Sequence, residues 1–153
     1  MSKEKFQLKS FKEMKSLSEE TPCFSASLYY DGKKVCEVSN RGQGGCHDYR
    51  PCKGYTYKDI QKLETIAKEI KGEETESLDG LVYDLIEDVE TQKYVKKAVK
   101  QGFPFVMNVY KKESFLERNY EVLIRSEAFK TKEAMDKQIN KNPDLVHKIV
   151  NNP

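Results

Sequence analysis

Residues whose types could support chemistry are concentrated in one segment, NRGQGGCHDYRPCKGYTY, which runs from residue 40 to residue 57. The segment combines glycines, cysteines, tyrosines, arginines and one of the chain's 2 histidines, whereas lysine and glutamate dominate much of the rest. Functional groups lie on loops more often than on helices and strands. We therefore expect the functional site of the protein in this segment.

A glycine-rich stretch opens the segment, where Gly42, Gly44 and Gly45 follow Asn40 and Arg41. Backbone N–H groups in such loops can bind a phosphate. Known phosphate-binding motifs match poorly, because a P-loop needs Gly-Lys-Ser or Gly-Lys-Thr at a helix start and a dinucleotide site needs G-x-G-x-x-G. Glycines also supply positive φ angles in compact turns. The pattern favours such a turn over an anion site, and both interpretations stay open.

The cysteines and histidines suggest zinc binding or nucleophilic catalysis. Zinc ligands usually come in pairs about two to four residues apart, but the chain has no Cys-x-x-Cys. We therefore expect no metal site and no cofactor. The order Cys46, His47, Asp48 resembles a catalytic triad on paper only, because neighbouring side chains on an extended chain point apart. An enzyme that depends on Cys46 or His47 is thus our third functional hypothesis, and a non-enzymatic protein is favoured.

Aromatic and basic residues interleave in the second half of the segment, at Tyr49, Arg50, Lys53, Tyr55 and Tyr57. This pattern suits stacking on nucleic-acid bases. It equally suits a protein interface, where Tyr and Arg are enriched. In a third interpretation Tyr49 and Tyr57 pack beneath the loop and only Tyr55 is exposed. The predicted binding residues are Asn40, Arg41, Gly42, Gly44, Gly45, His47, Tyr49, Arg50, Lys53 and Tyr55.

A predicted β-hairpin precedes the segment and must position it. Residues 24–30 alternate between apolar and polar, which predicts a half-buried strand, and Asp31-Gly32 predicts a turn into a second strand at 35–39. A tight turn alone would place charged residues opposite apolar ones, whereas a one-residue slip restores one apolar face. We therefore expect a bulge or a longer loop in this hairpin, with the pairs Ala26–Val38 and Leu28–Cys36.

Capping boxes predict helices on both sides of the hairpin and its loop. Ser10 and Glu13 predict a short helix over about 11–18, and Thr56 and Asp59 predict a longer helix that ends at Gly72. Periodicity predicts the remaining elements. They are a helix from Ser77 to Gly102 that the polar residues 90–93 could divide, strands at 105–111 and 120–126 with a charged connection at 111–119, a helix at 131–140, and a final short helix that starts at Asn142.

The order of these elements predicts an α+β fold. We expect a single domain over residues 1–153, in which two β-hairpins share one antiparallel sheet packed by about four helices, with residues 1–9 as a flexible or edge segment. No apolar run is long enough to span a bilayer, and the charged N-terminus does not resemble a signal peptide. The net charge of +2 provides no global basic field. We therefore expect a cytoplasmic protein with reduced cysteines and no membrane partner.

Two stretches of the chain resemble small, mostly uncharacterised proteins encoded by bacteriophages. The stretches are FSASLYYDGKKVCEVSNRGQGGCHDY at residues 24–49 and LVYDLIEDVETQKYVKKAVKQG at residues 81–102. The resemblance implies a small accessory protein in the cytosol of a bacterial host, of a kind that often disables a host defence enzyme such as a CRISPR nuclease. It implies no catalytic residue. The matching residues of the first stretch are Gly32, Lys33, Val35, Asn40, Gly42, Gly44, Gly45 and Tyr49.

Three functional hypotheses follow, in order of preference. The first is a non-enzymatic accessory protein that binds a bacterial host protein, or a protein–nucleic-acid complex, through the segment 40–57. The second is a nucleotide- or nucleic-acid-binding protein that uses the glycines of 40–45 for phosphate and the residues 49–57 for stacking. The third is the Cys/His-dependent enzyme.

Overall fold

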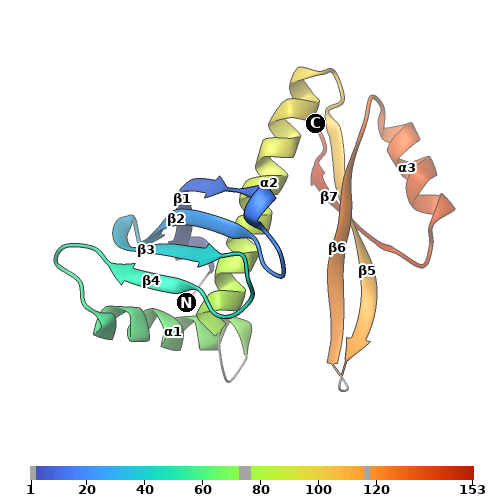
Figure 1. Ribbon diagram of the computed structural model, residues 1–153. Coiled ribbons are helices and arrows are strands. Elements are labelled where there is room, and N and C mark those ends of the chain that lie inside the picture. Colours follow the sequence, from blue (N-terminus) through green and yellow to red (C-terminus); the bar gives the residue numbers. More distant parts are fainter. Residues whose placement is uncertain (1–2, 73–76, 116–117) are drawn as a thin grey trace. The chain divides into compact units, whose positions relative to one another are not determined.

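The computed structural model describes residues 3–72, 77–115 and 118–153, and the chain is α+β as predicted (Figure 1). It divides into two compact units, which we call unit 1 (1–89) and unit 2 (90–153) and describe separately. The boundary falls within the long helix α2 (Ser77–Lys100). The expectation of a single domain over 1–153 stays a prediction.

Unit 1 contains a four-stranded antiparallel sheet with the order β1-β2-β3-β4. Alternating apolar residues of its strands form the inner face, which carries Phe24, Ala26 and Leu28 from β2. The strands are β1 (Phe6–Glu13), β2 (Cys23–Tyr30), β3 (Lys33–Arg41) and β4 (Asp48–Pro51).

The β2–β3 hairpin confirms the predicted register and the predicted bulge. Ala26 pairs with Val38 and Leu28 pairs with Cys36, and the register shifts between Leu28 and Tyr29. The turn is nevertheless tight, because Asp31 and Gly32 both have positive φ angles, of 51° and 79°, as the favoured two-residue hairpin turn requires. The turn and the bulge therefore occur together, and the bulge corrects the register that the turn alone would impose.

The predicted helix over 11–18 is wrong. Residues 11–13 are the end of the strand β1, which pairs with β2 at the edge of the sheet, and only the 3₁₀ turn η2 (Lys15–Leu17) is helical. Ser10, the expected helix cap, has a φ of 55° and lies where the register shifts between Lys9 and Lys12. The capping-box pattern is local, whereas pairing with β2 buries Phe6, so the tertiary contact decided the structure.

Two helices pack on the inner face of this sheet and complete the core of unit 1. α1 (Tyr57–Lys71) begins with the predicted capping box of Thr56 and Asp59, and Gly72 ends it in the left-handed conformation. A side chain of α1 also caps α2, because the carboxylate of Glu64 accepts hydrogen bonds from the backbone N–H groups of Ser77 (2.9 Å) and Leu78 (2.8 Å). The core side chains from the two helices include Ile60, Leu63, Ala67, Leu78, Leu81, Val82, Leu85 and Ile86.

Unit 2 contains a three-stranded antiparallel sheet with the order β6-β5-β7. On one side of the sheet Val106 packs with Val95 and Ala98 of α2. On the other side Met107 and Val109 pack with Met135 of α3. The elements are β5 (Phe105–Phe115), β6 (Arg118–Phe129), α3 (Lys132–Lys141) and β7 (Val146–Asn151).

A buried amide joins three elements of unit 2. Asn108 of β5 donates to Thr91 Oγ1 of α2 at 3.0 Å, and its Oδ1 accepts from Ser126 Oγ of β6 at 2.6 Å. Asn108 is buried, so these contacts satisfy groups that would otherwise be costly to remove from water. The amide therefore specifies how β5, β6 and α2 meet.

Several predictions for unit 2 need correction. The final helix from Asn142 is wrong, since Asn142 ends α3 and residues 146–151 form β7 against the central strand β5. The charged stretch 111–119 is not a loop, because β5 reaches Phe115 and β6 starts at Arg118. The residues 90–93 do not divide α2.

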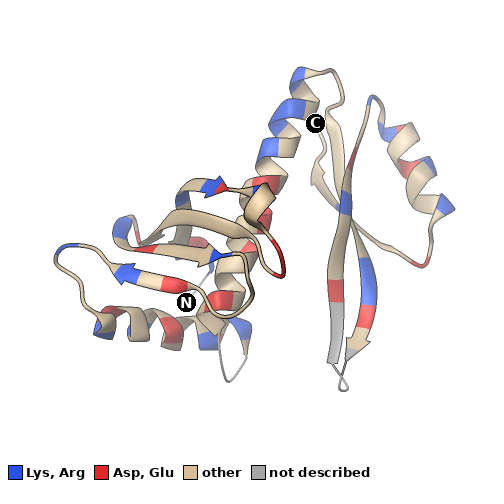
Figure 2. Cartoon of the chain, viewed as in Figure 1, with Lys and Arg blue, Asp and Glu red and all other residues tan. Residues whose placement is uncertain are grey.

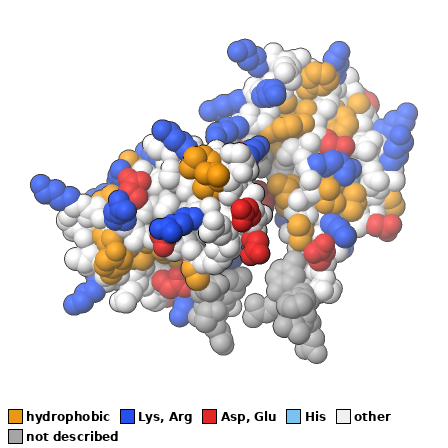
Figure 3. Space-filling view, viewed as in Figure 1, with side chains coloured by type: hydrophobic (Ala, Val, Ile, Leu, Met, Phe, Trp, Pro, Cys, Tyr) orange, Lys and Arg blue, Asp and Glu red, His pale blue; other side chains and the backbone are white. Residues whose placement is uncertain are grey.

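The two predicted hairpins therefore lie in two separate sheets, not in one. Among the described residues there are three α-helices, rather than about four. Apolar side chains also reach the surface of unit 2 between charged ones (Figure 3). They include Val122 and Ile124 of the edge strand β6, each 44% exposed. No helix in the described part of the chain is long and apolar enough to cross a membrane.

Candidate functional site

Asn40, at the end of β3, organises the glycine-rich loop. Its Oδ1 accepts from the N–H of Gly42 (2.8 Å) and from the hydroxyl of Thr21 (2.7 Å). Its Nδ2 donates to the carbonyl of Gly45 (3.3 Å) and lies 3.1 Å from Nδ1 of His47. Asn40 is only 4% exposed. A single buried amide thus holds the loop in one shape.

The loop uses its own N–H groups internally. Gly42 N–H donates to Asn40, and Gly44 N–H donates to the hydroxyl of Thr21 at 3.2 Å. The carbonyl of Gly42 in turn accepts from Glu19 N–H at 2.8 Å. These two glycine N–H groups are therefore engaged and do not point freely at a phosphate. The geometry favours the compact-turn interpretation of the glycines.

Close packing explains why residue 42 is a glycine. Its φ is 86°, and a Cβ atom there would lie 2.5 Å from the carbonyl oxygen of Leu17 and 2.9 Å from Cβ of Cys23. Neither neighbour is the free end of a flexible side chain. Any larger residue at position 42 would therefore displace the loop from η2 and β2.

His47 is buried and holds a defined tautomer. The Oδ1 of Asn40 accepts two hydrogen bonds, so its Nδ2 must face His47, and Nδ1 of the ring is the acceptor. The proton of the neutral ring therefore lies on Nε2, which is buried and has no hydrogen-bond partner among the described residues. Burial lowers the pKa of His47 below its ordinary value, against an opposing effect of Asp79. The rings of Tyr83 and Phe24 pack against the His47 ring, with ring centres 4.5 Å and 5.1 Å from its centre.

Asp79, in the first turn of α2, fastens the loop and β4 to the helix. Its Oδ2 accepts from the backbone N–H of His47 at 3.0 Å, and its Oδ1 accepts from the hydroxyl of Tyr49 at 2.5 Å. Burial, together with this hydrogen bond, raises the pKa of Tyr49 well above its ordinary value. Asp79 thus binds His47 and Tyr49, the two successive residues after the loop whose side chains point to the inner face.

Other charged residues of the segment point to the opposite, outer face of the four-stranded sheet. Alternation along the strands places Arg41, Asp48 and Arg50 on this face, and all three are exposed. Glu37 lies opposite Arg50 across β3 and β4, and Ser39 lies opposite Asp48. Both signs of charge are therefore interspersed, and Figure 2 shows blue and red bands on these strands.

A groove of about 920 Å³ is lined by residues of β2, β3 and the edge strand β4, from both faces of the sheet, and by the start of α1. We call it the β4 groove. Its charged lining consists of Glu37, Arg41, Asp48 and Arg50, and Tyr57 at the start of α1 adds an aromatic ring. The structure therefore places Arg41 and Arg50, two of the predicted binding residues, in one concave surface. The β4 groove is also lined by Met14, Cys23, Phe24, Ser25, Val38, Ser39, Asn40, His47, Tyr49 and Ile60.

The tyrosines are arranged differently from the third interpretation. Tyr49 packs inward, as that interpretation expects. Tyr57, however, is 66% exposed, whereas Tyr55 is half-buried against the core of unit 1. Position N1 of α1 turns Tyr57 away from the apolar stripe of the helix, which explains the exchange. Lys53 is exposed in the turn between β4 and α1.

Cys46, His47 and Asp48 do not form a triad. Asp48 lies on the outer face, whereas the His47 ring is buried on the inner side and contacts Asn40 rather than a carboxylate. Cys46 is exposed. Cys36 lies in the apolar core, where burial raises the pKa of its thiol to about 12. No group of three or more His, Cys, Asp or Glu side chains in residues 3–72, 77–115 and 118–153 is placed to hold a metal ion.

Sequence reasoning missed three residues of this site, namely Thr21, Asp79 and Tyr83. Thr21 belongs to no recognisable motif, and its hydrogen-bond partners, Asn40 and Gly44, lie about twenty residues further along the chain. Asp79 stands within an acidic stretch and near a helix start, where a favourable interaction with the helix dipole already explains an acid. Its position in the first turn of a helix that directly follows the loop and α1 was the one available signal.

Fold and site together define an α+β chain whose rigid, internally bonded loop stands beside a charged groove. No protein-family model, no curated protein and no solved structure matches the chain.

Proposed function

We propose that this chain is a non-enzymatic binding protein that engages another protein through the β4 groove and the adjoining loop. The observation that carries the proposal is that residues 40–57 contain two kinds of side chain. Those of Asn40, His47 and Tyr49 make contacts within the protein, whereas those of Arg41 and Arg50 are exposed and line the groove. A rigid support of this kind lowers the entropy lost when a partner binds.

The charges of the groove favour a protein partner over a nucleic acid. Glu37 lies opposite Arg50, and Asp48 lies on the same face of β4 as Arg50, so a polyphosphate backbone in the groove would meet carboxylates as well as guanidinium groups. A protein surface can match both signs at once, and such complementarity determines orientation and specificity. The exposed ring of Tyr57 is the type of side chain that acts as an anchor in protein interfaces.

The resemblance of residues 24–49 and 81–102 to bacteriophage accessory proteins supplies the biological context of the proposal. In that context the partner is a bacterial host protein, or a host protein–nucleic-acid complex, in the host cytosol. An inhibitor of a defence system such as a CRISPR nuclease fits a small protein that binds through a preformed surface.

Affinity capture from a bacterial lysate, followed by mass spectrometry, tests the proposal. The native chain should retain a host protein in stoichiometric amount, and the double variant Arg41→Glu, Arg50→Glu should lose it. Lys137→Ala, an exposed change on α3 in unit 2, is the matched control and should retain the partner. Capture that is equal in all three proteins would refute the role of the groove.

A second measurement separates the nucleic-acid alternative. Binding to single-stranded oligonucleotides that weakens steeply with salt, and that the same double variant abolishes, would replace the protein-partner proposal. The expected result is no such binding through Arg41 and Arg50.

A further inference from the structure

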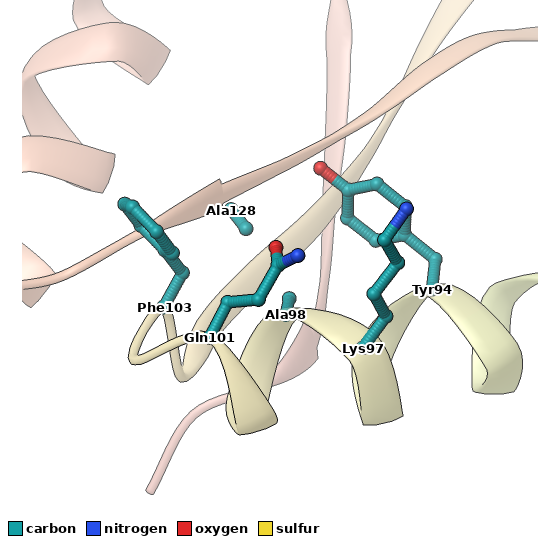
Figure 4. Close-up of a pocket in the computed structure, with 6 residues that line it drawn as sticks. All are labelled: Tyr94, Lys97, Ala98, Gln101, Phe103 and Ala128. Atoms are coloured by element: carbon teal, nitrogen blue, oxygen red, sulfur yellow. The ribbon is translucent and has the colours of Figure 1, made fainter.

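Unit 2 contains a second pocket, separate from the β4 groove, with a volume of about 300 Å³. Figure 4 shows Tyr94 near one end and Phe103 at the other, with Gln101 and Ala128 between them. Ala98 forms an apolar floor together with Ala128. We call it the α2 pocket. Its volume is near the lower end of the range of small-molecule sites, which is about 300–1,000 Å³.

The sequence builds the α2 pocket from one helix face and one turn. Tyr94, Lys97 and Ala98 share a face of α2 because residues three and four positions apart meet on a helix, and Gln101, just after the helix, stays on this face because its N–H donates to the carbonyls of Lys97 and Ala98. Gly102 follows in the turn with a φ of 88°, and the N–H of Phe103 donates to the carbonyl of Ala98 at 2.8 Å. This turn brings the Phe103 ring back to the same face.

Basic side chains predominate around the pocket. The stretch from Thr91 to Lys111 contains no acidic residue, and the basic end of α2 is visible in Figure 2. Lys97 lines the pocket, and Nζ of Lys130 lies 5.5 Å from the centre of the Phe103 ring. Burial and the carboxylate of Glu127 raise the pKa of Tyr94; Oε1 of Glu127 lies 3.2 Å from Nε of Arg125, and its Oε2 has no hydrogen-bond partner among the described residues.

From this combination we infer that the α2 pocket binds a nucleotide of one base and one phosphate. An apolar floor with an aromatic ring at each end accommodates a flat base. The side-chain amide of Gln101 offers a donor and an acceptor, which is the pair that reads the edge of adenine. Lys97 supplies the positive charge for the phosphate. The volume accommodates one nucleotide rather than two.

Amide chemical shifts of isotope-labelled protein, recorded during titration with adenosine monophosphate (AMP), test the inference. Shifts should concentrate at residues 94–103 and at Ala128. Lys97→Glu should weaken AMP binding about tenfold or more and affect adenosine much less, because only AMP carries the phosphate. Phe103→Leu should weaken the binding of both AMP and adenosine, since the aromatic ring contacts the base, which both ligands carry. Lys96→Glu is the matched control, because Lys96 is exposed on the same helix and does not line the pocket.

The inference fails if millimolar AMP leaves these amides unshifted in the native chain, or if Lys96→Glu and Lys97→Glu weaken AMP equally. The second outcome would mean a general attraction to a basic helix end. An oligoadenylate distinguishes the two sources of the nucleotide. Tighter binding than AMP at the same amides assigns the pocket to a nucleotide within a strand, and equal or weaker binding assigns it to the free mononucleotide.

Discussion

We predict that the contact between His47 and Asn40 makes unit 1 sensitive to mild acid. Protonation of His47 at Nδ1 would bring an N–H donor against the Nδ2 donor of Asn40, which lies 3.1 Å away. Asn40 cannot rotate its amide without losing the bonds from Gly42 and Thr21. The folded state therefore holds His47 neutral, and its pKa is lowered, with burial as the largest cause.

The sign and the size of the effect follow from this lowered pKa. In the unfolded chain His47 has a pKa near the ordinary value of 6.5. In the folded chain its pKa is lower, so the ring is still neutral at that pH. Stability from neutral His47 is thus complete above about pH 6.5. It falls by up to about 1.4 kcal/mol for each pH unit below that, down to the folded pKa. His47 is 6% exposed, so solvent screening does not reduce the effect much.

Urea unfolding followed by circular dichroism, between about pH 7.5 and about pH 5.5, measures this loss where few carboxylates titrate. His47→Asn is the informative variant, because Oδ1 of asparagine can occupy the place of Nδ1 and accept from Asn40 without titrating. It should be less stable at every pH, since it loses the ring contacts with Tyr83 and Phe24, but it should lose the slope. His147→Asn, the matched control at the other histidine, should keep the slope.

Two results would refute this reasoning. One is an equal pH slope in the native chain and in His47→Asn. The other is a proton resonance of the His47 ring that titrates at or above pH 6.5, the ordinary value. Either result would mean that the Asn40 amide does not enforce the neutral ring.

Three further predictions concern stability and are measured by the same unfolding experiment. Gly42→Ala should destabilise unit 1 by about 2 kcal/mol or more, because it adds a clash with Leu17 to an unfavourable φ, whereas Gly54→Ala, at a φ of 91° in open space, should lose only about 1 kcal/mol; equal losses would contradict the packing argument. Glu64→Ala should cost about 1–2 kcal/mol through the lost cap of α2, and Lys62→Ala, a change on the exposed side of α1, should cost little. Asn108→Ala should cost about 2–3 kcal/mol by leaving Thr91 and Ser126 without their amide partner, and a loss no larger than that of Asn140→Ala, at an exposed position of α3, would contradict its role.

Elements whose signals are local could be predicted from the sequence. The register of Ala26 and Leu28 followed from one apolar face, and α1 followed from a capping box and a terminal glycine. The strands β1 and β7 could not be predicted in this way. β1 pairs with β2 and β7 pairs with β5. These pairings depend on tertiary packing and not on a local sequence signal.

The candidate site divides along the same line. The glycine turn and the exposure of Arg41 and Arg50 follow from types and alternation of residues within the segment 40–57. The role of Asp79 does not, because its hydrogen bonds join residues about thirty positions apart and arise only when α2 packs on the sheet. The separation into two sheets has the same origin, since hairpins of similar pattern can pair with each other or apart.

The edges of the two sheets differ in how well they resist pairing with another chain. In unit 1, β4 is four residues long and ends in Pro51, and β1 is interrupted by its bulge at Ser10. Short strands, prolines and bulges all protect an edge. In unit 2, β6 is twelve residues long and carries Val122 and Ile124 exposed. Self-association of this chain at high concentration, including the first step of aggregation, should therefore begin along β6 and leave the sheet beside the β4 groove free.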